Sequence, residues 1–156
     1  MTETRSLIPA DAVLLHSESG SKAAIIAEVL EALPSIDPDQ AMAVIMEREK
    51  LGSTGIGHGI AIPHGRLPEL ETPITALIRH EGGIDFDAID GQPVHIVVVL
   101  LAPKDEDRSH LELLAGLARS LQKETVRRAV MEARTAEEIS ALFAIPAATA
   151  AASQAE

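Results

Sequence analysis

The first half of the chain carries apolar residues at the three-to-four-residue spacing of two amphipathic helices. The first helix follows Ser21, and its apolar positions share one face: Ile25, Ile26, Val29, Leu30 and Leu33. The second begins at Asp37 and Pro38, because aspartate caps free N–H groups and proline is tolerated at the first helical position. We expect its inward face to hold Ala41, Met42, Ile45 and Met46. The charged run 47–50 and Gly52 end it.

Shorter apolar runs between turn residues predict the strands of a sheet. Segments 12–15, 60–62 and 74–79 are each expected to be strands, and Pro63 ends the second. Segment 94–102 is apolar at successive positions, which is typical of a central strand covered on both faces. The Asp90-Gly91 pair before it supplies a turn signal.

The last third of the sequence predicts further helices. Ser109 and Glu112 form a capping-box pattern ahead of an apolar face, and Thr135 and Glu138 repeat the pattern. Residues 147–156 lack apolar periodicity, so we expect a disordered tail. The sequence has neither an internal repeat nor a long linker. It therefore predicts one layered α/β domain over residues 1–156.

Composition narrows the classes of function. The 24 acidic and 13 basic residues give a net charge of -11, which disfavours binding to nucleic acid or to anionic lipid. The absence of cysteine excludes disulfides and thiolate chemistry and fits a reducing compartment. Residues 1–10 lack the features of a signal peptide, and the apolar run 94–102 is too short to cross a bilayer. We therefore expect a cytoplasmic protein without membrane insertion.

The densest chemical signal is the glycine-rich segment 52–59, which we expect to be a loop. Its glycines would let successive backbone N–H groups point at one anion. The candidate phosphate-binding residues are Ser53, Thr54, Gly55 and Gly57. The two hydroxyl groups would donate hydrogen bonds, or would merely shape the turn. The segment lacks the Gly-Lys-Ser/Thr ending of a nucleotide-binding P-loop and the G-x-G-x-x-G spacing, so an anion site is favoured over a nucleotide site.

His64 is the candidate nucleophile. It follows a strand and Pro63, which fixes the approach of the chain, and Gly65 after it removes bulk beside the ring. A neutral imidazole attacks phosphorus well, and the ordinary pKa of histidine leaves much of it neutral near pH 7. The alternative is a histidine that only occupies a surface loop.

His110 and Arg48 are the candidate partners of His64. The first turn of a helix favours anions, so a neutral imidazole at His110 would donate a hydrogen bond to a phosphoryl oxygen. The guanidinium of Arg48 would fork onto phosphoryl oxygens. The alternatives are a solvent-facing histidine at a helix start and a solvated charge run.

Several motifs together resemble the enzyme IIA family of the bacterial sugar phosphotransferase system, in its fructose/mannitol class. The resemblance covers about residues 8–143, which mark the expected core. It lies in segments 48–49, 51–57, 59–64, 86–94, 100–103 and 110–115. Segments 63–67 and 86–94 are most similar to the nitrogen-related, regulatory branch. His58 departs from the pattern, since the family is expected to have asparagine or another small polar residue there.

The resemblance implies a mixed β-sheet flanked by helices in three layers. It implies that His64 is the phosphoryl acceptor, through Nε2, with His110 beside it and Arg48 contributing. It further implies a histidine phosphocarrier protein as donor, regulatory protein targets, and neither a metal nor a cofactor. An alternative is a sugar-specific IIA component that passes its phosphoryl group to a separate IIB partner.

A metal hydrolase is the alternative from another class. Three histidines can bind zinc, and His58, His64 and His110 would be the ligands. The sequence contains no HExxH helix and no close carboxylate–histidine pairing to support such a site. The expected function is therefore phosphoryl carriage on a histidine.

Overall fold

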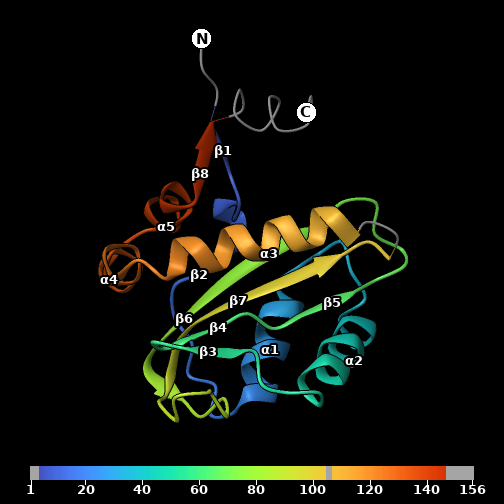
Figure 1. The fold of residues 1–156 in the computed structure, drawn as a ribbon, viewed down its shortest axis with the longest axis horizontal. Coiled ribbons are helices and arrows are strands. Elements are labelled where there is room, and N and C mark those ends of the chain that lie inside the picture. Colours follow the sequence, from blue (N-terminus) through green and yellow to red (C-terminus); the bar gives the residue numbers. More distant parts are fainter. Residues whose placement is uncertain (1–3, 105–106, 147–156) are drawn as a thin grey trace.

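The computed structural model describes residues 4–104 and 107–146 (Figure 1). The helices of this part of the chain are η1 (Ala10–Ala12), α1 (Lys22–Glu31), α2 (Pro38–Glu49), α3 (Asp107–Leu121), α4 (Glu124–Glu132) and α5 (Ala136–Leu142). The strands are β1 (Thr4–Ser6), β2 (Val13–Leu14), β3 (Gly55–Gly57), β4 (Ile60–Ala61), β5 (His64–Arg66), β6 (Ile74–Ile84), β7 (Val94–Ala102) and β8 (Ala144–Pro146).

The main sheet of the described residues has six strands, in the order β2-β6-β7-β4-β3, with β5 also paired to β7. Strands β4 and β5 both run parallel to β7, whereas β6 runs antiparallel to it, so the sheet is mixed. Strand β7 thus occupies the central position that its apolar sequence predicts. The predicted strand 94–102 is confirmed.

Two apolar cores lie on opposite faces of this sheet. Alternate residues of β7 pack against α1 and α2 on one face, and Ile96 and Val98 pack against α3, α4 and α5 on the other. Figure 1 shows the same division, with α1 and α2 on one side of the strands and α3 to α5 on the other. The predicted three-layer α/β fold with a mixed sheet is confirmed.

Short-range capping signals account for three of the helix starts. Ser21 Oγ accepts from the N–H of Ala24 (3.1 Å), Asp37 Oδ1 from that of Asp39 (3.0 Å), and Thr135 Oγ1 from that of Glu138 (3.1 Å). The prediction that Ser109 caps a helix is wrong, because α3 already includes Asp107 and Ser109 is helical. His110 still belongs to the beginning of that helix.

The strand predictions need four corrections. Residues His64–Arg66 form β5, although the sequence predicted no strand directly after Pro63. Strand β6 continues past Arg79 to Ile84, because a register shift allows Ile84 to pair with Val94. The expected loop 52–59 contains β3, which forms a hairpin with β4 through His58 (φ 59°) and Gly59 (φ 81°). Positive φ at both central residues is the geometry of a two-residue hairpin turn.

The fourth correction concerns a strand pair that the sequence did not indicate. Strands β1 and β8 pair antiparallel at one end of the molecule, away from the main sheet (Figure 1). The tail predicted for residues 147–156 lies outside the described residues. In the part of the chain that is described, no helix has the length and apolar composition needed to cross a bilayer.

Candidate functional site

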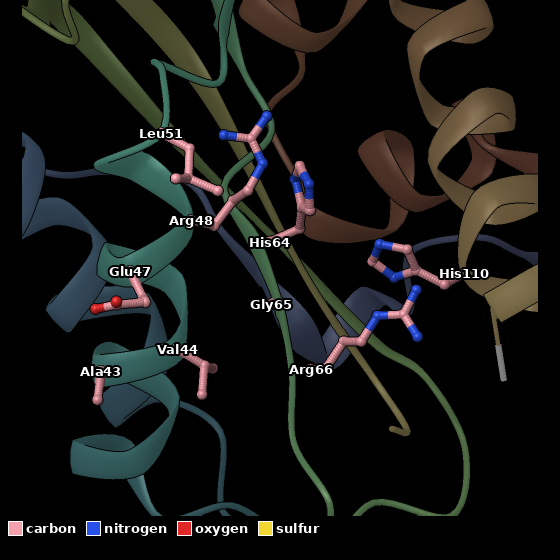
Figure 2. Close-up of a pocket in the computed structure, with 9 residues that line it drawn as sticks. All are labelled: Ala43, Val44, Glu47, Arg48, Leu51, His64, Gly65, Arg66 and His110. Atoms are coloured by element: carbon pink, nitrogen blue, oxygen red, sulfur yellow. The ribbon is translucent and has the colours of Figure 1, made fainter. Parts of the chain in front are cut away.

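A pocket of about 670 Å³ lies beside β5 of the main sheet, between α2 and α3 (Figure 2). Strand β4 and strand β5 pair with β7 in one register, since Ile60 is opposite Ile96 and His64 is opposite Leu100. Pro63 interrupts the N–H ladder between them without changing this register, as is typical of an edge position. The pocket lining consists of Ala43, Val44, Glu47, Arg48, Leu51, His64, Gly65, Arg66 and His110.

Strand alternation decides which side chains of β5 point to which layer. Gly65 faces α2, and a Cβ built on it would lie 2.8 Å from Val44 Cγ2. Because neighbouring strand residues point to opposite faces, His64 and Arg66 share the face toward α3. His110 lies on α3, and its ring centroid is 5.5 Å from that of His64.

The ring of His64 is held in one tautomer. Its Nδ1 lies 2.8 Å from the carbonyl oxygen of Ile62, and a carbonyl only accepts, so Nδ1 carries the proton. The neutral ring then keeps its lone pair on Nε2. Burial lowers the pKa of His64 below the ordinary value of 6.5, and the charges of Arg48 and Arg66 lower it further. The Ile62 hydrogen bond and Glu49 raise this pKa in part, with a net lowering.

Arg48 sits in the last turn of α2 and reaches the same pocket. Its Nη1 donates to the carbonyl oxygen of Gly52 (2.9 Å), beyond the end of the helix. Glu49, the next residue, turns inward: it accepts from the N–H of Thr54 (3.2 Å) and from the Thr54 hydroxyl, and it pairs with Lys22. The structure thus brings together His64, His110 and Arg48, as the sequence reasoning expected.

The four glycine-segment candidates lie elsewhere. None of Ser53, Thr54, Gly55 and Gly57 belongs to the pocket lining given by the described residues. Ser53 Oγ donates to the carbonyl oxygen of Phe86 (2.6 Å), and the N–H of Gly55 donates to Ser53 Oγ (3.0 Å). These polar groups therefore have acceptors within the protein, and phosphate binding by the four residues stays a prediction.

The remaining histidines do not join the pocket. His58 is an exposed turn residue whose N–H donates to Asp90 Oδ2 (3.1 Å). His95 bonds through Nδ1 to the carbonyl oxygen of His80 (3.1 Å), so its ring has a partner within the fold. Within residues 4–104 and 107–146, no three His, Asp or Glu side chains are placed to hold a metal ion. The described residues therefore contain no cluster of side chains that could serve as the zinc ligands of that alternative.

Arg66 is a pocket residue that the sequence reasoning missed. The sequence predicted no strand directly after Pro63, so it gave no reason to pair the two side chains. Once residues 64–66 form a strand, Arg66 lies two positions after His64 and shares its face. Its Nη1 donates to the carbonyl oxygen of Lys104 (3.1 Å), in the connection that leads to α3. Leu51 was also missed; it lies on the pocket rim with 84% of its surface exposed.

The comparisons with known proteins agree with this fold. Residues 6–144 match the family described as phosphoenolpyruvate-dependent sugar phosphotransferase system, EIIA 2, and the chain belongs to that family. Phosphoryl carriage through a histidine is general for this family, and its members interact with phosphocarrier or IIB partners.

Within the family, the nitrogen regulatory branch is well represented among the relatives. The chain is 41% identical to the nitrogen regulatory protein of Pseudomonas aeruginosa over 128 residues, covering 80% of this chain and 83% of that protein. It is 31% identical to the fructose-specific EIIA component of Haloferax volcanii, covering 92% and 96%. The crystal structure of nitrogen regulatory protein IIA-Ntr from Neisseria meningitidis superposes with a TM-score of 0.83 at 36% identity, covering 88% and 96%.

Proposed function

We propose that this protein accepts a phosphoryl group on Nε2 of His64 from a histidine phosphocarrier protein and acts as a regulatory switch. The observation that carries the proposal is the hydrogen bond from Nδ1 of His64 to the carbonyl oxygen of Ile62. This bond aims an unprotonated Nε2 away from the strand. The lowered pKa keeps the ring neutral, and therefore nucleophilic, at neutral pH.

The transfer needs no general base. The Nε2 lone pair of His64 forms the new P–N bond while the P–N bond of the donor phosphohistidine breaks, and the donor nitrogen leaves with that electron pair. Nδ1 keeps its proton throughout, and the Ile62 carbonyl stabilises the positive charge that the ring gains. Arg48 and His110 face the same pocket and would stabilise the phosphoryl oxygens in a loose transition state.

A labelling experiment tests the acceptor. The protein is incubated with labelled phosphoenolpyruvate, the general phosphotransferase enzyme and the phosphocarrier protein. Acid-labile label should appear on the wild type and be lost in His64→Ala. His58→Asn is the matched control, since His58 is exposed and lies outside the pocket lining. Label that persists in His64→Ala would overturn the assignment.

The regulatory part of the proposal rests on the nitrogen regulatory relatives. A phosphoryl group adds about -1.5 to -2 charges at the pocket, enough to change which protein surfaces bind there. Partner recovery from cell extract should differ between the phosphorylated protein and His64→Ala. Equal recovery in both states would refute the switch.

The fructose-specific relative supports a second candidate function, onward transfer to a sugar-specific IIB partner. Incubating the phosphorylated protein with purified IIB components distinguishes the two. Rapid loss of label from His64 to a IIB protein would favour the transport role, and retention of the label favours the regulatory one.

A further inference from the structure

Two arginines from different elements face the pocket of His64. In Figure 2, Arg48 reaches in from α2 and Arg66 from β5, and the rings of His64 and His110 lie between the two guanidinium groups. The family resemblance assigns a role to Arg48 only. We propose that Arg66 is a second phosphoryl-binding cation, which holds the phosphoryl group on His64 from the α3 side.

The strand geometry supports this placement. His64 and Arg66 pair with Leu100 and Ala102 of β7, so both side chains leave the same face of β5. Both residues are partly exposed at the pocket, whereas Gly65 between them is buried against α2. A phosphoryl group bound to Nε2 of His64 would therefore lie in the pocket that Arg66 also lines.

The guanidinium of Arg66 is positioned before any phosphoryl group arrives. Its Nη1 donates to the carbonyl oxygen of Lys104 (3.1 Å), which anchors it near the start of α3. A guanidinium carries five N–H donors in a fixed fork, so bonds to protein acceptors and contact with a phosphoryl oxygen can coexist. Anchoring reduces the reorganisation that binding a new anion would otherwise require.

The electrostatics of the site call for more than one cation. The protein has a net charge of -11, and the C-terminal end of α2, which borders the pocket, carries the negative end of its helix dipole. A phosphoryl dianion would meet repulsion from both. The positive charge of Arg66 already acts on the ring, because it contributes to lowering the pKa of His64.

The proposal rests on His64 being the acceptor, and the experiment separates the two claims. Phosphoryl acceptance and the 31P titration of the phosphohistidine are measured for wild type, Arg66→Gln, Arg66→Lys and Arg108→Gln. Arg108 is an exposed arginine of α3 outside the pocket lining, so its variant controls for the loss of one positive charge. Arg66→Gln should slow acceptance about ten- to hundredfold and raise the pKa of the phosphoryl group. Arg66→Lys should restore much of both, and Arg108→Gln should match wild type.

A second measurement uses the wild-type chain and so does not depend on variant folding. The side-chain 15Nε signal of Arg66 should shift on phosphorylation, while that of Arg108 stays in place. An unmoved Arg66 signal, or Arg66→Gln with wild-type acceptance and an unchanged 31P titration, would overturn this inference and leave His64 as acceptor. Label that persists in His64→Ala would instead overturn the proposed function itself.

Discussion

The imidazole rings of His64 and His110 lie 5.5 Å apart between centroids, with their planes inclined at 53°. His64 lies on the short edge strand β5, and His110 lies in the first turn of α3. Only the tertiary fold therefore brings the two rings together. His110 is only 5% exposed. Its ring is thus fixed by packing within reach of a group bound to Nε2 of His64, at a helix start that favours negative charge.

Replacing His110 with alanine should slow phosphoryl acceptance by about a hundredfold, because one preorganised hydrogen-bond donor to the developing charge is lost. Rapid-quench measurement of the single-turnover rate checks this, with His58→Asn as a control outside the pocket. Urea unfolding of the same variants separates a rate effect from a loss of stability. An acceptance rate equal to wild type in His110→Ala would rule out the role of His110.

The lowered pKa of His64 predicts a definite pH dependence. By histidine side-chain NMR, its titration midpoint should lie below 6.5, and Arg48→Gln should raise it because a repelling positive charge is removed. As the pH is lowered, the unfolded chain takes up a proton on this histidine near pH 6.5, and the folded chain takes it up only at a lower pH. The free energy of unfolding should therefore fall as the pH falls from 6.5 to the folded midpoint, and this contribution should be constant above 6.5.

Urea unfolding at several pH values checks the stability part of this prediction. The variant His64→Gln lacks the titrating group, so its stability should depend less on pH between 6.5 and the folded midpoint. A His64 midpoint at or above 6.5 would contradict the argument, as would equal pH dependence in the two proteins.

Glu49 opposes the two arginines in setting this pKa. It is 7% exposed, accepts from the N–H of Thr54 and pairs with Lys22 Nζ at 3.1 Å. Glu49→Gln should lower the pKa of His64 further, since the negative charge that raises it is removed. It should also lower the free energy of unfolding by about 2 kcal/mol, because a charge-assisted buried network is weakened. Glu31→Gln, at an exposed residue of α1 outside the pocket lining, should change neither quantity, and equal effects of the two variants would contradict this prediction.

Much of the fold could be predicted from sequence because its signals are local. Three helices are capped by side chains that bond a backbone N–H two or three residues further on: those of Ser21, Asp37 and Thr135. The continuous apolar sequence of β7 likewise indicates that the strand is buried. The pairing of β1 with β8 joins the two ends of the described chain, and no local pattern specifies such a contact. The capping pattern at Ser109 and Glu112 gave a wrong helix start, because so short a pattern does not show that α3 already begins at Asp107.

The site was predictable in part. Motif spacing and the family resemblance pointed to His64, His110 and Arg48, and their convergence follows once β5 is placed between α2 and α3. The hairpin of β3 and β4 explains why the glycine segment, expected at the anion site, lies outside the pocket lining of the described residues. Its glycines allow a tight turn and close packing, as at Gly55, where a Cβ would lie 2.9 Å from Cα of Ala88. Glycine patterns alone do not distinguish such packing from an anion nest.

Gly65 should tolerate no side chain, because β5 approaches α2 closely there. A Cβ would lie 2.8 Å from Val44 Cγ2 and 3.2 Å from the Val44 carbonyl carbon. Gly65→Ala should therefore lower the free energy of unfolding by about 1–3 kcal/mol and displace His64, with slower phosphoryl acceptance. Gly20→Ala is the matched control, since a Cβ at Gly20 would meet no atom within 4 Å. Urea unfolding of both variants checks this, and equal stabilities would show that β5 and α2 are less tightly packed than described.

Arg79 ties α4 to the sheet and should be among the most costly residues to replace. It is 4% exposed; its Nε donates to the carbonyl oxygen of Leu15 (3.0 Å), and its Nη1 donates to those of Val130 (2.9 Å) and Ala133 (2.7 Å). The two latter carbonyls lie at the C-terminal end of α4, where a cation is favoured.

Arg79→Met keeps the apolar stem but leaves these buried carbonyls without their charged donor, so the free energy of unfolding should fall by about 3 kcal/mol. The control is Arg128→Met, because Arg128 is an exposed residue of α4 paired with Glu124 (2.7 Å), and such a pair contributes less than about 1 kcal/mol. Urea unfolding measures both changes. If Arg79→Met cost no more than Arg128→Met, the guanidinium would not be what secures the end of α4.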